Sequence, residues 1–223
     1  MTDQDLRAEV QRALTLEPSV PQIHIGVNVQ DGHVIFTGSV PSYAAALEAR
    51  RVALQVRGVR SLHEDLTVAL PLAHRRDDLS LTHEIALTLR GHVFLQGQAV
   101  HVSSARGCVT LSGDVEWHYQ RLMAEHSLWH VIGVRRLSNM IYLTQRVPVA
   151  AAALQSELRQ ALRRHGSLRK VHVSVAKREV VLTGEVETWS DHQITEQLTW
   201  AHAGVQTVRN QVEVTWIRSR SSH

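Results

Sequence analysis

The sequence predicts an α+β chain made of three tandem copies of one helix–strand–strand–helix–strand (αββαβ) unit. Three observations support this prediction: a glycine motif that recurs three times, an apolar repeat of helical period before it, and alternating apolar residues around it. Each copy is expected to form a three-stranded mixed sheet packed against two helices. The expected domains are residues 1–70, 77–145 and 149–217 of the 223-residue chain.

The recurring motif places one glycine near the end of an alternating stretch and a Gly-Val pair 20 residues later. The motif glycines are Gly38, Gly113 and Gly184, and the later ones are Gly58, Gly133 and Gly204. A glycine on the inward phase of a strand indicates another backbone close by, so we expect a helix to pack directly over each motif glycine. The later glycines are expected to end the second helix of each copy, in the C′ position that favours left-handed backbone.

Helical periodicity opens each copy, because apolar residues fall at i, i+4 and i+8. These residues are Leu6, Val10 and Leu14 in the first copy, Leu81, Ile85 and Leu89 in the second, and Leu154, Leu158 and Leu162 in the third. A second helix is expected over residues 41–57, 116–132 and 188–203. It would serve as the crossover that returns the last strand parallel to the middle one.

Alternating residues between the helices predict a hairpin in each copy. In the first copy, a two-residue turn at Asp31-Gly32 would place Val29 opposite Val34. The turn at Lys177-Arg178 in the third copy lacks a glycine and is expected to adopt another geometry.

Composition is typical of a globular chain, with 43% hydrophobic and 20% charged residues. The net charge is +3, and 22 of the 24 cationic residues are arginines, which suit phosphate contacts. A single cysteine excludes an internal disulfide. The N-terminal residues lack the pattern of a secretory signal, and the longest apolar run, Val147–Leu154, is too short to span a bilayer. We therefore expect a cytoplasmic protein, with a peripheral membrane role left open.

The order of these elements and the motif itself resemble the BON domain family, named for bacterial osmotically inducible and nodulation proteins. The resemblance covers nearly the whole chain three times. It rests on Asp31-Gly32-His33-Val34 with Thr37-Gly38-Ser39-Val40, on Ser112-Gly113-Asp114-Val115, and on Thr183-Gly184-Glu185-Val186. The whole looks like triple-BON proteins without a signal peptide. The resemblance implies a non-enzymatic, stress-associated module without a cofactor, of a kind proposed to bind phospholipid surfaces.

No catalytic or metal-binding set is expected. His126 and His130 have a spacing that can bind a metal, but they do not recur in the other copies. Cys108 is likewise not repeated, and no paired base accompanies it. Basic residues are spread over all copies and only 4% of residues are aromatic, so nucleic acid is not expected as a partner.

The tryptophans and arginines supply the candidate binding surface: Trp117, Trp129, Trp189, Trp200, Arg135 and Arg136. One interpretation is core packing of the indoles. The other is an exposed aromatic rim that docks on an anionic phospholipid surface. Two function classes therefore stay open. One is a phospholipid-binding or scaffold module, and the other is a protein–protein module that assembles into a homo-oligomer without a lipid partner.

Overall fold

A computed structural model describes residues 2–20, 24–97, 99–144, 150–176, 179–202 and 204–215. Domain 1 contains α1 (Asp3–Leu16), β1 (Ile25–Gln30), β2 (His33–Val40), α2 (Tyr43–Gln55) and β3 (Ser61–Val68). Domain 2 contains α3 (Asp78–Arg90), the 3-10 turn η3 (Val93–Leu95), β4 (Ala99–Ala105), β5 (Cys108–Val115), α4 (His118–His126) and β6 (Arg136–Leu143). Domain 3 contains α5 (Ala151–Arg164), η4 (Gly166–Leu168), β7 (Val171–Ala176), β8 (Glu179–Val186), α6 (Trp189–Trp200) and β9 (Thr207–Val214).

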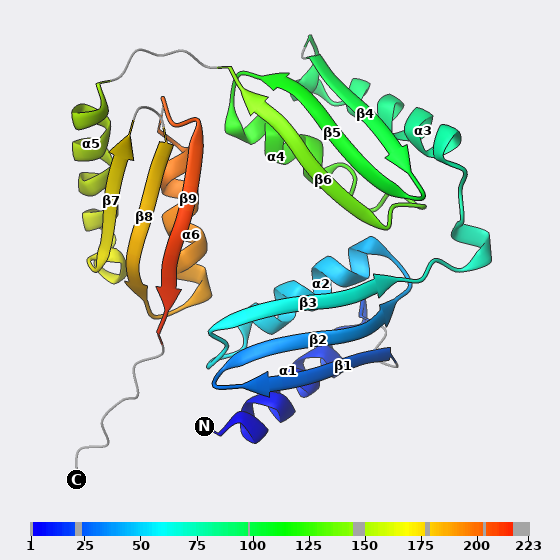
Figure 1. Cartoon of the computed structure of the whole chain (residues 1–223), viewed down its shortest axis with the longest axis horizontal. Helices are drawn as coiled ribbons and strands as arrows, with labels where there is room; N and C mark the ends of the chain where they lie inside the picture. The colour runs from blue at the N-terminus through cyan, green and yellow to red at the C-terminus, as the bar shows by residue number, and fades with distance from the viewer. Residues whose placement is uncertain are drawn as a thin grey trace.

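The three sheets have the same topology, which confirms the predicted αββαβ unit. In each, the second strand of the domain lies in the middle, antiparallel to the first strand and parallel to the third. Two helices pack on one face of each sheet (Figure 1). A short turn, η2 (Leu72–His74), lies between domains 1 and 2. Most of the linker between domains 2 and 3, the turn at Lys177-Arg178 and the end of the chain from Trp216 lie outside the described residues.

Each domain has a core of its own, built on the predicted helical stripe. The nine stripe residues of α1, α3 and α5 are all buried. They pack against the inward residues of the sheet, of which Phe36, Leu111 and Leu182 are fully enclosed. Burying a side chain of this size contributes about 1.5–3 kcal/mol. Periodicity therefore identified the inner face of each first helix correctly.

The hairpin turn in domain 1 has the predicted register, with Val29 paired to Val34. Asp31 and Gly32 both have positive φ, at 52° and 81°, which is the backbone of a two-residue type I′ turn. Arg106 and Gly107 repeat this turn in domain 2, with φ of 54° and 78°.

The motif positions need glycine because the backbone of the hairpin's other arm leaves no space for a side chain. The expectation that a helix lies above them was wrong. A Cβ at Gly113 would lie 1.8 Å from the carbonyl oxygen of Ala99, on the antiparallel strand β4. At Gly38 and Gly184 the corresponding distances are 2.0 Å to His24 and 2.1 Å to Lys170. All three glycines also have φ between 110° and 116°, which side chains rarely adopt. A close backbone was correctly inferred, but it belongs to the first residue of the partner strand in domain 2 and to the residue just before that strand in domains 1 and 3.

The second helices end earlier than predicted. Helix α2 ends at Gln55, α6 at Trp200 and α4 at His126, which is two, three and six residues before the predicted ends. Beyond α4, Leu128 and Val131 continue the apolar pattern and still pack in the core of domain 2, although they lie outside the helix. The later glycines keep the expected positive φ of 91–108°, but they lie in the turn before the last strand and not at C′.

In domains 1 and 2, an aspartate at the start of the first helix accepts hydrogen bonds from the hairpin turn. The sequence did not predict this contact. The Asp3 carboxylate accepts hydrogen bonds from the backbone amides of Asp31 (2.8 Å) and Gly32 (3.1 Å). Asp78 does the same for Arg106 (2.7 Å) and Gly107 (3.0 Å). These amide hydrogen bonds lower the pKa of Asp78 below its ordinary value of 3.8.

Replacing Gly113 by alanine should destabilise domain 2 by about 2–5 kcal/mol, because it combines a backbone clash with a strained φ. Urea unfolding followed by circular dichroism measures the change. Gly97→Ala is the matched control, since Gly97 also has positive φ (78°) but no atom within 4 Å of an added Cβ. Equal losses in the two variants would show that the carbonyl contact does not matter.

Asp78→Asn should destabilise domain 2 at pH 7 and leave domain 3 unchanged. A carboxyl with a depressed pKa stabilises the fold above its unfolded pKa, and this contribution disappears as pH falls through the folded value. The difference between Asp78→Asn and the unmodified chain should therefore shrink as pH falls below about 3.9, the unfolded pKa of aspartate, and vanish in strong acid. Unfolding curves at pH 7 and in acid test this; a difference that persists in strong acid would contradict it.

Candidate functional site

The first residue of each second helix contacts another domain. Tyr43, His118 and Trp189 each lie five residues after a motif glycine and begin α2, α4 and α6. They are therefore equivalent positions in the three copies. Each one reaches a different neighbour, and together the three contacts link domain 1 to 2, domain 2 to 3 and domain 3 to 1.

Tyr43 packs against the core of domain 2. The pKa of its hydroxyl is raised, first by burial and then by the carboxylate of Glu125 on α4. The electrostatic influence of Glu125 and the apolar contact both indicate that the start of α2 lies against domain 2.

His118 lies flat against Trp200, the last residue of α6. The ring centroids are 3.9 Å apart and the ring planes differ by 2°. Burial lowers the pKa of His118 from 6.5 to about 4, and the nearby Arg121 acts in the same direction. Nδ1 of His118 is enclosed and has no hydrogen-bond partner among the described residues. This contact therefore favours the neutral imidazole.

Trp189 makes the third contact, between domains 3 and 1, which are farthest apart in the chain. Its Nε1 donates a hydrogen bond of 3.0 Å to the carbonyl oxygen of Val59 in domain 1. Its ring packs against the cores of both domain 1 and domain 3. His192 lies on the same ring, with centroids 4.8 Å apart, and burial lowers the pKa of this histidine although Glu196 favours its charged form.

These contacts arrange the three domains around a common centre. Figure 1 shows α2, α4 and α6 on the inner side of the arrangement and α1, α3 and α5 on the outer side. The first residue of the second helix contacts domain 2 from domain 1, domain 3 from domain 2, and domain 1 from domain 3. Contacts that run head to tail in this way are heterologous and can close a ring.

The structure does not gather the predicted tryptophans and arginines on one surface. Trp189 and Trp200 lie in the contacts between domains. Trp129 is half-buried and packs at a tilt against His126, and its Nε1 has no hydrogen-bond partner among the described residues. Arg135 and Arg136 are exposed at the start of β6. Trp117 is also exposed, but it lies beyond the opposite end of the sheet, roughly 25 Å away along an eight-residue strand.

An exposed aromatic cluster at one end of domain 2 is the clearest candidate for a binding surface. We define it as Val93, Phe94, Trp117 and Tyr119, whose exposed fractions are 72%, 55%, 42% and 48%. The rings of Phe94 and Tyr119 meet edge to face, with centroids 5.9 Å apart. The cluster combines the η3 turn with the start of α4.

Gln120 holds the two segments of this cluster together. Its side-chain nitrogen donates to the carbonyl oxygen of Phe94 (3.0 Å), and its Oε1 accepts from the amides of Trp117 (2.9 Å) and Glu116 (3.1 Å). The Gln120 side chain is buried. The aromatic side chains are thus presented from a fixed backbone.

Trp117 occupies a position where the other two domains have a helix-capping residue. Ser42 accepts a hydrogen bond from the amide of Ala45, and Thr188 accepts one from the amide of Asp191. Such caps stabilise a helix by about 1 kcal/mol. Domain 2 has an exposed indole in place of the cap. Aligning the three copies on the motif glycine would have revealed this departure from the sequence alone.

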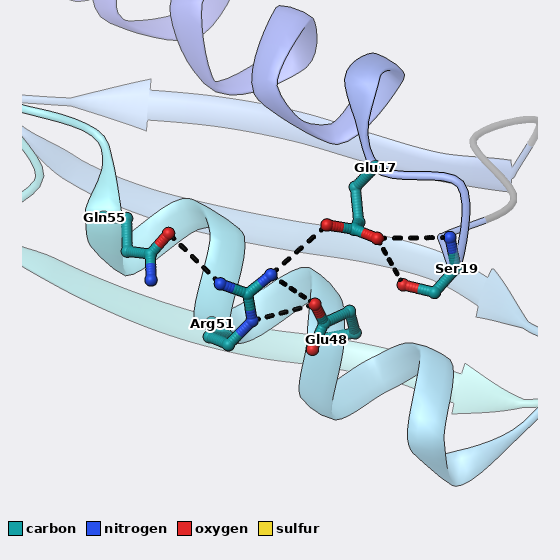
Figure 2. A network of polar contacts seen from close by, with 5 residues as sticks. All are labelled: Glu17, Ser19, Glu48, Arg51 and Gln55. Atoms are coloured by element: carbon teal, nitrogen blue, oxygen red, sulfur yellow. Dashed lines mark hydrogen bonds and ion pairs between the residues drawn. The ribbon is translucent and has the colours of Figure 1, made fainter.

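A groove between α1 and α2 of domain 1 has a volume of about 690 Å³. Figure 2 shows the polar network along it: Arg51 donates to Gln55 (3.2 Å), pairs with Glu17 (3.2 Å) and also contacts Glu48, while Glu17 accepts from Ser19. Because the arginine is already paired with two carboxylates, the groove offers little free charge to a ligand.

The residues considered for chemistry remain apart. Cys108 is exposed on β5. Across the described ranges, no group of three or more His, Cys, Asp or Glu side chains is close enough to hold a metal ion. None of the helices described is long and apolar enough to cross a membrane.

A family model for the BON domain matches residues 2–69, 77–145 and 150–215. The chain therefore belongs to the BON domain family, with three copies of the domain. Osmotically-inducible protein Y of Escherichia coli (strain K12) is a relative, 31% identical over 150 residues, which cover 62% of this chain and 71% of the relative.

Two solved structures of CdsD, a structural protein of the type III secretion system of Chlamydia trachomatis, were also matched. They are 19% and 18% identical, cover 96% of this chain and 100% and 93% of their own, and have TM-scores of 0.28 and 0.29. Similarity this low says nothing about the arrangement of domains here.

Trp189→Phe should weaken the contact between domains 1 and 3 by about 1 kcal/mol, because the ring stays but the hydrogen bond to Val59 is lost. Urea unfolding followed by circular dichroism measures the loss. Trp117→Phe is the control, since it makes the same change at an exposed indole. If both variants unfold alike, the Trp189 contact does not hold the domains together.

Proposed function

We propose that this chain is a non-enzymatic binding protein of the osmotic stress response that docks on anionic phospholipid surfaces through the aromatic cluster of domain 2. The stress association is suggested by the relative, whose name is osmotically-inducible protein Y. The observation that carries the proposal is the exchange of a helix cap for the exposed Trp117, flanked by three further exposed apolar side chains.

The composition of the cluster suits a membrane interface. Tryptophan and tyrosine are enriched at the level of lipid headgroups, because their rings have an apolar body and a polar edge. Valine and phenylalanine can enter the acyl boundary more deeply. A local arrangement that gives up stability for exposed apolar surface is typical of a functional site.

The charges near the cluster favour an anionic surface. Arg90, which is exposed, ends α3 just before η3, and Arg121 follows Gln120 on α4. Two exposed acidic residues, Asp114 and Glu116, precede Trp117 in the chain. Attraction between arginines and anionic headgroups contributes about 1 kcal/mol per cation near the surface and weakens as salt rises.

Trp117→Ser should separate binding from stability. Restoring a capping residue should leave domain 2 equally stable or raise its stability by up to about 1 kcal/mol. The affinity for phosphatidylglycerol vesicles, measured by co-sedimentation, should fall about tenfold. Burying a large apolar side chain contributes at least about 1.4 kcal/mol, which corresponds to a factor of ten in affinity. Binding should also decline with added salt and be weaker with phosphatidylcholine vesicles.

The matched control is Leu79→Ser, which removes a side chain that is 81% exposed on α3 but lies outside the cluster. Equal vesicle binding by the two variants would contradict the proposal. If the unmodified chain does not bind vesicles but Trp117→Ser changes its oligomeric state in native mass spectrometry, the cluster serves protein assembly instead.

A further inference from the structure

The stack of His118 on Trp200 joins two domains through groups that the chain connection does not force together. His118 begins α4 of domain 2 and Trp200 ends α6 of domain 3, 82 residues later. The rings lie in parallel planes at a centroid distance of 3.9 Å. The imidazole ring of His118 is therefore itself one of the main contacts between domains 2 and 3.

The surroundings of His118 do not provide for a positive charge. Its Nδ1 is enclosed without a hydrogen-bond partner among the described residues. Along α4, Arg121 already places a cation nearby. From α6, the charged group at this contact is Glu196, whose Oε1 accepts a 3.4 Å hydrogen bond from Nε1 of Trp200. The carboxylate of Glu196 is bound to the indole and is not among the groups that shift the pKa of His118, which are burial and Arg121. Protonation of His118 would therefore place a charge in a half-buried contact next to a cation that repels it.

We propose that the His118–Trp200 stack is an acid-sensitive clasp, which holds domain 3 against domain 2 when the imidazole is neutral and releases domain 3 when it is protonated. Release would open the closed arrangement between domains 2 and 3 only, because Trp189 still holds domain 3 to domain 1 and each domain has a separate core. The resulting device responds to mild acidification.

The direction of the effect follows from the pKa of His118. Burial lowers this pKa from 6.5 to about 4 in the docked state. A released imidazole binds a proton more readily, so the docked state is favoured most above about pH 6.5, and this preference is lost as pH falls toward about 4. With these two values, the docking equilibrium constant falls about 30-fold between pH 8 and pH 5. The face of the Trp200 ring attracts cations and would instead favour docking of the protonated imidazole. Whether docking weakens or tightens in acid therefore tests the proposal directly.

Single-molecule fluorescence energy transfer on the full chain measures the separation of the two domains. One dye is attached to Cys108, which is exposed on domain 2, and the other to an introduced Ser174→Cys on the exposed face of domain 3. At pH 8 the molecule should show one short separation. At pH 5 a longer separation should appear, with the ratio of open to closed molecules raised about 30-fold. Circular dichroism checks that the domains remain folded at both pH values.

Two variants identify the group responsible. His118→Phe keeps an aromatic ring for the stack but cannot be protonated, so it should stay closed at both pH values. Trp200→Ala removes the stacking partner and should be open at both. The proposal is overturned if the unmodified chain stays closed or tightens at pH 5, if His118→Phe opens at either pH, or if Trp200→Ala remains closed at pH 8.

Discussion

The approach of a backbone carbonyl to a strand-interior glycine is the constraint on which the rest of this structure depends. At Gly113 the carbonyl of Ala99 leaves no space for a Cβ, and the positive φ redirects the strand near its end. The second helix then begins five residues later in every domain. A local requirement of the hairpin therefore fixes which residue stands at the start of each crossover helix.

That residue decides how the domains meet. The same position is Tyr43 in domain 1, His118 in domain 2 and Trp189 in domain 3, and all three face another domain. Aromatic rings suit this task because they bury a large area at small conformational cost, while the phenol, imidazole and indole differ in their polar groups. The differences give three contacts of distinct chemistry: one near a carboxylate, one built on a stacked imidazole whose pKa is lowered by burial, and one anchored by a hydrogen bond.

Much of the fold could be predicted from the sequence because it depends on local patterns. The helical stripes, the Val29–Val34 register and the Asp31-Gly32 turn all follow from the spacing of neighbouring residues. The identity of the backbone that approaches Gly38 does not, because a missing side chain indicates a close neighbour without naming it. The end of α4 at His126 was also predicted wrongly, because Leu128 and Val131 continue the apolar pattern and pack in the core from beyond the helix.

The candidate sites were harder to recognise, for two different reasons. Trp189 contacts a carbonyl 130 residues away, and an indole that packs between domains has the same sequence pattern as one in a core. Trp117, in contrast, could have been singled out by comparing the copies, because Ser42 and Thr188 at the same position are helix caps. Departures from the pattern of the repeat were more informative than the residue types themselves.

The central claim is that three BON domains close on one another through one equivalent position. Small-angle X-ray scattering of the unmodified chain at neutral pH tests this most directly. The claim predicts a scattering curve that matches the closed arrangement of Figure 1, with a single compact distance distribution. A curve typical of three separate domains on flexible connections would contradict it.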